Sequence, residues 1–381
     1  MAQTDIFSRE EFLLPKDTHN ASLLNGDELR LPKNREDDDF VAYVKKILKN
    51  YLVVIKVFDG DEALIIKENH QKIESFCNSI IKSIELYYDG FISSSFDVFS
   101  EGMALLKEQL FLYKKKTIPT NLFKIRRGKP NPFESKEMFH IPFEKREKCI
   151  SYRFSISGFP SLYLGNSIYT CLREVGIRNE PWSVSLFSIL EKELKLIDIS
   201  IPTRHLGELF YGTKELGIPL YSFKDYIIAW PLTALCSIKV KNNYEFKPEY
   251  IIPQHLMQWV RQNEDVDGIV YNSTKFDDDS ISTSIDPHLN YVFPVKKISS
   301  HGHCQSLKSK IKLTDPVYFD TVVDSSNIHV KNPMPSDPKD FPFPGWNKQA
   351  ITHNKETLSY RETIYGVLEE KLFNMPLKTL T

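Results

Sequence analysis

Two hydrophobic patterns follow one another along the chain. Between about residues 40 and 115, apolar side chains recur at three- and four-residue steps, for example at Val41 and Val44. This spacing places apolar side chains on one stripe of a helix. Similar stretches at about 62–86 and 94–114 predict two further helices. The first pattern therefore predicts a small helical module that packs against the rest of the chain or binds a partner.

The second pattern, between about residues 121 and 296, mixes short β-rich runs with helical stretches. Helices are predicted at about 203–216, 222–235 and 252–264, and Pro253 suits the first turn of the last one. Strands and helices that alternate irregularly favour an α+β fold over a regular parallel array. Strands are predicted at five runs, which read SVSLFSIL, LKLIDIS, CSIKV, DGIVYNS and NYVFPV.

The two ends of the chain are polar. The first 38 residues finish in the acidic run Glu36–Asp39, which indicates a mobile or loosely docked arm. After about residue 300 the chain is polar and proline-rich, and a helix is predicted at about 355–373. The patterns together divide the chain into a polar arm (1–38), a helical accessory module (39–118), an α+β domain (119–300) and a C-terminal extension (301–381).

Composition narrows the class of protein. The chain has 381 residues, of which 41% are hydrophobic and 26% charged, as is normal for a folded soluble protein. A formal net charge of −1 gives no overall basic field, so we expect no direct nucleic-acid binding. Five scattered cysteines indicate reduced thiols and a cytoplasmic protein. The start lacks a secretory pattern, and no apolar run approaches membrane-spanning length, so we expect no membrane contact.

The stretch between Arg153 and Glu174 carries the most chemical information. Leu162 and Leu164 alternate with Tyr163, so the leucines face one side of a short strand and the tyrosine faces the other. A capped helix follows, with Glu174 at the edge of its apolar stripe. Each polar residue alone has an ordinary explanation as a surface charge or packing residue. Their ordered combination is what points to chemistry.

That combination resembles the RES family, which is named for an arginine, a glutamate and a serine. Its pattern is an arginine with an aromatic residue and asparagine, a glycine turn, Leu-Tyr-Leu, a helix with glutamate, and a serine after a late strand. The resemblance covers about residues 121–296. The matching positions are Arg153-Phe154, Gly158, Leu162-Tyr163-Leu164, Glu174-Val175 and, after DGIVYN, Ser273.

Two positions depart from the family pattern. Ser155 stands where the family has asparagine, and Lys124 stands at the usual first arginine. A lysine is a point charge, whereas arginine offers a planar fork. Lys124, Arg126 and Arg127 all stay candidates for contact with a ligand, and Arg126 is our choice among them. His140 lies in a segment typical of a longer, stand-alone branch of the family, and either lines the cleft or packs in the core.

The resemblance implies an ADP-ribosyltransferase-like mixed β-sheet core and an enzyme that consumes NAD as its substrate. Arg126 and Arg153 would then bind the pyrophosphate, with Tyr163 stacked on the nicotinamide. Glu174 would stabilise the positive charge that develops on the ribose as the nicotinamide leaves. Ser273 would orient the ribose or nicotinamide by hydrogen bonds. We expect no cofactor and no metal, because the run His301–Cys304 lacks spaced ligand partners.

The acceptor decides the activity, and the sequence does not display it. Water would give a glycohydrolase, phosphate a phosphorylase, and a protein side chain a mono-ADP-ribosyltransferase. A catalytically lapsed NAD-binding protein is a further alternative, motivated by Lys124 and Ser155. The resemblance also implies a growth-inhibiting toxin held in check by an Xre-type antitoxin or another inhibitory protein. A homo-oligomer stays open.

Overall fold

The chain, described here by a computed structural model, forms two compact units. The first comprises residues 1–112 and 201–252, and the second comprises residues 113–200 and 253–381. Residues 201–252 therefore join the N-terminal helices, although they follow several strands of the other unit in the sequence. The structure describes residues 19–106, 121–128, 133–177, 180–190, 194–200, 223–242, 244–275, 288–319, 350–353, 356–360 and 363–380.

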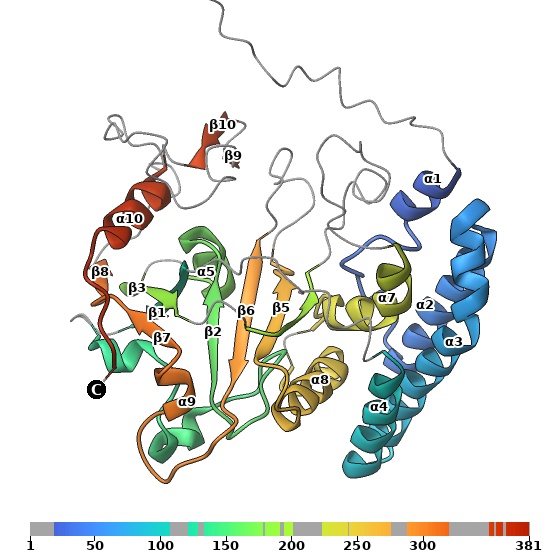
Figure 1. Ribbon diagram of the computed structural model, residues 1–381, viewed down its shortest axis with the longest axis horizontal. Coiled ribbons are helices and arrows are strands. Elements are labelled where there is room, and N and C mark those ends of the chain that lie inside the picture. Colours follow the sequence, from blue (N-terminus) through green and yellow to red (C-terminus); the bar gives the residue numbers. More distant parts are fainter. Residues whose placement is uncertain are drawn as a thin grey trace, which may run out of the picture. The chain divides into compact units, whose positions relative to one another are not determined.

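The first unit is helical in the part that is described (Figure 1). Its core contains Tyr51 and Trp230, whose rings stack with centroids 4.5 Å apart. The indole nitrogen of Trp230 donates to the carbonyl of Leu29, 3.0 Å away, which fixes the N-terminal segment to the helices. The elements are α1 (His19–Asn25), α2 (Phe40–Val54), η1 (Ile55–Val57), α3 (Gly60–Tyr88), α4 (Ile92–Leu105), α7 (Phe223–Ser237) and η5 (Pro248–Tyr250).

Helices α3 and α4 form a closely packed pair. The hydroxyls of Ser83 and Ser95 each donate to the other residue's backbone carbonyl, at 2.8 and 2.7 Å. Further along, a Cβ added at Gly102 would lie 2.8 Å from the Cβ of Ser79. Only glycine fits at such an approach, so small residues set the spacing of this helix pair.

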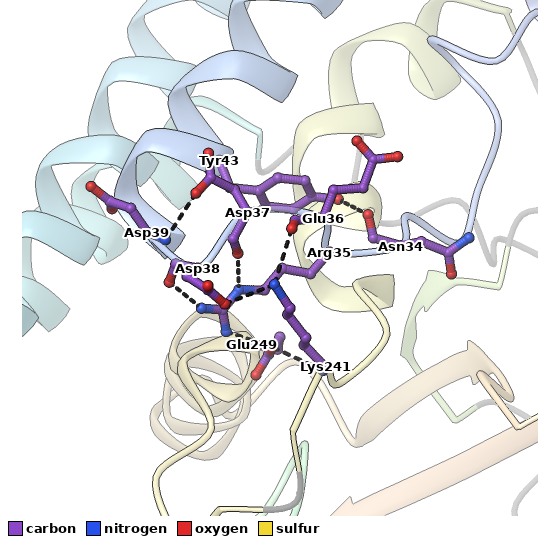
Figure 2. A network of polar contacts seen from close by, with 9 residues as sticks. All are labelled: Asn34, Arg35, Glu36, Asp37, Asp38, Asp39, Tyr43, Lys241 and Glu249. Atoms are coloured by element: carbon purple, nitrogen blue, oxygen red, sulfur yellow. Dashed lines mark hydrogen bonds and ion pairs between the residues drawn. The ribbon is translucent and has the colours of Figure 1, made fainter.

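The acidic run before α2 is docked through its backbone, which for the described residues 19–38 fits the docked alternative of the predicted arm (Figure 2). Arg35 donates to the carbonyls of Asp37 and Asp38, at 2.9 and 2.5 Å, and to Glu249 at 2.9 Å. The Arg35 and Glu249 side chains are only 9% and 1% exposed. The backbone of the run therefore encloses the Arg35 guanidinium, while the side chains of Glu36–Asp39 stay exposed.

The predicted strand CSIKV is also wrong. Helix α7 continues to Ser237, and beyond it Lys239 makes only an isolated bridge to Asn34. The predicted helix at 222–235 is confirmed by α7, and that at 62–86 by α3. The helix predicted at 94–114 is confirmed by α4 as far as Leu105, and its residues 107–114 lie outside the described part of the chain. The helix predicted at 203–216 lies outside the described residues.

The second unit is built on a mixed sheet, which confirms the α+β class. Its strand order within the described residues is β4-β5-β6-β2-β1-β3-β7, and β8 also pairs with β3. β4 and β5 are parallel, and the other neighbours are antiparallel. The strands are β1 (Asn121–Arg127), β2 (Ser161–Gly165), β3 (Trp182–Ile189), β4 (Leu196–Ile199), β5 (Gly268–Asn272), β6 (Leu289–Pro294), β7 (Ile311–Leu313) and β8 (Val317–Phe319).

The two faces of this sheet bury different apolar clusters. On one face, Leu162 and Leu164 of β2 pack with Leu122 of β1 and Phe293 of β6. On the other face, Phe123 and neighbouring β1 and β3 side chains pack against two helices, one at residues 168–175 and one at residues 364–373. Because side chains alternate along a strand, Tyr163 must face away from the leucines on either side of it.

Short elements complete the second unit. None of the helices in the described ranges combines the length and apolar character that crossing a bilayer requires. The helix predicted at 355–373 is confirmed only in its second half, because a β-hairpin precedes it. The elements are η2 (Ser135–Met138), η3 (Phe143–Lys148), α5 (Ile168–Val175), α8 (Ile251–Gln262, its first two residues counted with the first unit), α9 (Gln305–Lys308), β9 (Ala350–His353), β10 (Glu356–Ser359) and α10 (Ile364–Phe373).

Candidate active site

Arg153 lies in a tight turn closed by its neighbours. The backbones of Tyr152 and Ser155 exchange two hydrogen bonds, both 3.2 Å long. Arg153 is 9% exposed, and its Nη2 donates to the hydroxyl of Thr274 at 3.4 Å. Phe154, next in the turn, is fully buried with its ring 4.5 Å from that of Tyr271. The turn therefore anchors an aromatic side chain and directs the guanidinium toward the end of β5.

The same turn holds Tyr163. The hydroxyls of Ser155 and Tyr163 are 2.6 Å apart, within hydrogen-bond distance. The ring of Tyr152 meets that of Tyr163 edge-on at 6.2 Å. Ser155, which departs from the family asparagine, is thus in direct contact with the tyrosine predicted to stack on the substrate. Its hydroxyl fixes the phenol end of that side chain.

Gln254 of α8 supports the turn from a distant part of the sequence. Its side-chain amide nitrogen lies 2.7 Å from the hydroxyl of Ser151, 3.0 Å from the carbonyl of Tyr152 and 3.1 Å from that of Ser155. One amide therefore ties together both ends of the Arg153 turn. This contact could not be predicted from local sequence, because the partners are about 100 residues away in the chain.

Glu174 is held by a buried amide. It projects from the last turn of α5, and its Oε1 accepts a 2.6 Å hydrogen bond from Nδ2 of Asn290. Asn290 is 5% exposed and belongs to β6, where it pairs with Gly165 on one side and Tyr271 on the other. The carboxylate is thus fixed at the point where β2, β5 and β6 meet.

Ser273 follows β5 at the same end of the sheet. Its backbone nitrogen donates to the carbonyl of His288, 2.8 Å away, and its hydroxyl accepts from the nitrogen of Lys275 at 3.2 Å. Since Oγ already accepts a bond, its proton is available for donation to a ligand. Nδ1 of His288 lies 3.0 Å from the hydroxyl of Thr170, and burial lowers the pKa of His288 to about 4. This histidine bonds to Thr170, so the arrangement does not form a serine-hydrolase triad.

These contacts bring Arg153, Tyr163, Glu174 and Ser273 to one region. Arg153 bonds to the residue after Ser273, and Glu174 bonds to Asn290, which is paired with Tyr271 at the end of β5. Tyr163 lies on β2, the strand next to β6, and on the face opposite the leucine cluster. The arrangement offers a cation, a phenol, a carboxylate and a hydroxyl, a set suited to an anionic ligand that carries a sugar and a flat ring.

Lys124 and Arg126 are placed differently. They alternate with Phe123, which pairs with Gly165, so they lie on the face of the sheet opposite Tyr163. Nζ of Lys124 donates to the carbonyl of Phe139 at 2.7 Å, and Nη1 of Arg126 donates to that of Glu137 at 2.5 Å. Burial, with the nearby Arg126 charge, lowers the pKa of Lys124 to about 7. The structure does not bring these cations to Arg153, and their contact with a ligand stays a prediction.

Arg127 and His140 are likewise engaged elsewhere. Arg127 is exposed and forms an ion pair with Glu180 at 3.5 Å. His140 is 1% exposed, and its Nε2 accepts from the backbone nitrogen of Cys304 at 2.9 Å. Its Nδ1 therefore carries the proton and donates to the carbonyl of Ile141 at 2.7 Å. With both ring nitrogens bonded to backbone, His140 has a structural role, and burial lowers its pKa to about 3.

The structure does not test the expectation that the protein holds no metal. Within the described ranges, no three His, Cys, Asp or Glu side chains gather as metal ligands would. Three residues that the sequence analysis missed contact the predicted site: Asn290 bonds to Glu174, Thr274 to Arg153, and Gln254 to the turn around Arg153. A polar residue in the apolar strand NYVFPV was the one available signal for Asn290.

Comparison with known proteins identifies related sequences. A family model described as the RES domain matches residues 131–293. A protein of Bacillus subtilis (strain 168) with the name "Putative toxin YopC" is 33% identical over 320 residues, which cover 78% of this chain and 71% of that protein. No solved structure matches the chain. The matched segment contains Arg153, Tyr163, Glu174 and Ser273, whereas Lys124 precedes it.

Proposed function

The chain belongs to the RES-domain family, and on this premise we propose that it cleaves the nicotinamide–ribose bond of NAD. One observation carries the proposal above the others. The 2.6 Å hydrogen bond from Asn290 holds the Glu174 carboxylate at the end of the sheet where Ser273 and Arg153 also lie. A carboxylate fixed beside a cation and a hydroxyl donor suits a substrate that is anionic at one end and becomes cationic at a sugar carbon.

Glu174 supplies the central electrostatic effect. When nicotinamide leaves, positive charge develops on the ribose carbon and its ring oxygen, as in glycoside hydrolysis. A preorganised carboxylate stabilises that charge in the transition state more than in the ground state. Asn290 bonds only Oε1, and no hydrogen bond within the described part of the chain engages Oε2. That second oxygen is the atom we assign to the ribose.

The other three residues bind and orient the substrate. The planar guanidinium of Arg153 suits a pyrophosphate oxygen pair. Tyr163, whose hydroxyl is held by Ser155, presents an aromatic surface to the cationic nicotinamide ring. The Ser273 hydroxyl donates to a ribose or carboxamide oxygen. None of these roles requires a covalent intermediate or a metal ion.

We infer that water or phosphate is the acceptor, which would make the enzyme a glycohydrolase or a phosphorylase. Water would give ADP-ribose, nicotinamide and a proton. Phosphate would give ADP-ribose 1″-phosphate and nicotinamide. In both cases the electron pair of the broken bond leaves with nicotinamide, and the acceptor oxygen forms the new bond to the ribose carbon.

The biological role we propose is that of a growth-inhibiting toxin in the cytoplasm, where NAD would be depleted. The relative from Bacillus subtilis is named as a toxin, which supports this role by family membership. An antitoxin of the Xre type or another inhibitory protein would then be needed to restrain the activity. Induced expression should stop growth, and the Glu174→Gln variant should permit it at the same protein level.

Nicotinamide release by the purified protein tests the proposed reaction. We expect the wild type to release nicotinamide from NAD, with phosphate either raising the rate or leaving it unchanged. The Glu174→Gln variant should lose at least about a hundredfold in kcat, because it removes a charge that stabilises the transition state. Glu147→Gln, at an exposed position of η3, is the matched control. An inactive wild type, with or without phosphate and lysate protein as acceptor, would overturn the proposal.

A further inference from the structure

Helix α10, in the C-terminal extension, contains a buried acid that the proposed mechanism does not use. Glu369 is 0% exposed, and α10 lies against α5 and β3 (Figure 1). Its Oε2 is buried and has no hydrogen-bond partner among the described residues. Burying a carboxyl group without full hydrogen bonding destabilises the folded state. A buried acid at this position therefore points to a role that an apolar side chain could not fill.

The contacts of Glu369 are at the start of α5. Its Oε1 accepts 2.6 Å and 2.5 Å hydrogen bonds from the backbone nitrogen of Ile168 and the hydroxyl of Tyr360. Ile168 is the first residue of α5, and its N–H has no partner within the helix. The Tyr360 oxygen lies 3.5 Å from the next backbone nitrogen, that of Tyr169.

The first turn of α5 is therefore capped from two sides. Ser167, the residue before the helix, accepts from the backbone nitrogen of Thr170 at 3.0 Å. The C-terminal segment provides the acceptors for Ile168 and Tyr169. A local serine cap is common at helix starts, whereas an acid supplied 201 residues later in the chain ties the helix to another element.

We propose that Glu369 is a positioning residue: by fixing the first turn of α5, it determines where Glu174 stands at the other end of that helix. The proposal rests on the assignment of Glu174 as the catalytic carboxylate. The two residues are joined by one short helix, in which six residues span about 9 Å. A shift of the first turn therefore reaches Glu174, and misplacement by about 1 Å is enough to impair catalysis.

The protonation state strengthens this assignment. Burial raises the pKa of Glu369 to about 8, although the bonds from Tyr360 and Ile168 act in the opposite direction. At neutral pH the side chain is therefore mainly a neutral acid, with its proton on the unbonded Oε2. A glutamine has the same shape, carries no charge and keeps an oxygen acceptor for both donors. A charge on Glu369 would raise the pKa of two titratable neighbours, Cys171 and Tyr360.

Three variants separate positioning from simple packing. Glu369→Gln keeps the acceptor, Glu369→Ala removes it, and Tyr360→Phe removes one donor while retaining the ring. Glu370→Gln, one position along α10, is the matched control. We expect Glu369→Gln to keep kcat within about twofold at pH 7, and Glu369→Ala to lose about tenfold or more in kcat with KM changed less than threefold. A folded Glu369→Ala variant with wild-type kcat would overturn the proposal.

Hydrogen exchange supplies a readout that does not depend on NAD turnover. The amides of Ile168 and Tyr169 should exchange about tenfold faster in Glu369→Ala than in the wild type, and the control should match the wild type. If the wild type cleaves no NAD but these amides respond, the proposed function fails and the α10–α5 link stands. If Glu369→Ala does not fold, Tyr360→Phe is the variant to measure. Wild-type amide exchange together with wild-type kcat in Tyr360→Phe would then overturn the proposal.

Discussion

Replacing Asn290 by alanine removes the one described hydrogen bond that orients the Glu174 carboxylate. The donor is 5% exposed and the bond is 2.6 Å long, so it is a short bond to a charged acceptor in a poorly solvated place. Neighbouring backbone pairs of β6 with β2 and β5 do not depend on the side chain. The substitution should therefore alter the carboxylate more than the sheet.

The expected size follows from the strength of such bonds. Hydrogen bonds to charged groups contribute about 1.5–3 kcal/mol. If this free energy places Glu174 for the transition state, its loss lowers kcat by about 10- to 150-fold, since about 1.4 kcal/mol corresponds to a factor of ten. KM should change little, because Asn290 bonds to the carboxylate and not to the substrate.

Steady-state nicotinamide release measures this effect, with circular dichroism to confirm folding. Asn69→Ala is the matched control, because Asn69 is a buried amide of the first unit that donates to the carbonyl of Ile65 at 2.8 Å. Asn290→Asp has nearly the same shape but sets a second carboxylate against Glu174, so it should be worse than alanine. Wild-type kcat in folded Asn290→Ala, or an active Asn290→Asp variant, would show that Asn290 does not position the Glu174 carboxylate.

Three further predictions concern stability. Gly165→Ala should destabilise the protein by about 1–3 kcal/mol, because the new Cβ would lie 2.6 Å from Sγ of Cys171. In chemical denaturation, adding Cys171→Ala to this variant should recover most of the lost free energy of unfolding. As pH rises from 4.5 to about 8, the free energy of unfolding of the wild type should fall relative to that of Glu369→Gln, by at most about 5 kcal/mol. The reason is that the folded state holds the Glu369 proton more tightly than the unfolded state, and a pH-independent difference between the two proteins would contradict it. Glu249→Ala should lower the free energy of unfolding by about 3 kcal/mol, because it leaves the Arg35 side chain buried without its carboxylate partner. Unchanged stability in chemical denaturation would indicate that the backbone carbonyls alone satisfy that cation.

Local pattern was enough to predict the elements that carry the site. Alternation of Leu162, Tyr163 and Leu164 predicted a strand with an outward tyrosine, and β2 has this form. The helix with Glu174 was expected from its cap and apolar stripe, and Ser167 caps it. These features depend on neighbours within a few residues, which a sequence displays directly.

Features set by distant partners could not be predicted from the sequence. Glu174 and Asn290 are 116 residues apart, and nothing in either neighbourhood indicates the pairing. The run CSIKV has a β-rich composition, but α7 extends into it because its side chains pack in the helical unit. The acidic run before α2 keeps its side chains exposed, as its composition indicates, but nothing in the run predicts that its backbone carbonyls accept from Arg35. Tertiary contacts decided each of these cases.

The most direct test of the central claim is an experimental structure of the Glu174→Gln variant soaked with NAD. We expect to find the nicotinamide ring on Tyr163, the ribose carbon beside residue 174, the pyrophosphate on Arg153 and a hydrogen bond from Ser273. NAD bound instead on the opposite sheet face, at Lys124 and Arg126, would contradict it.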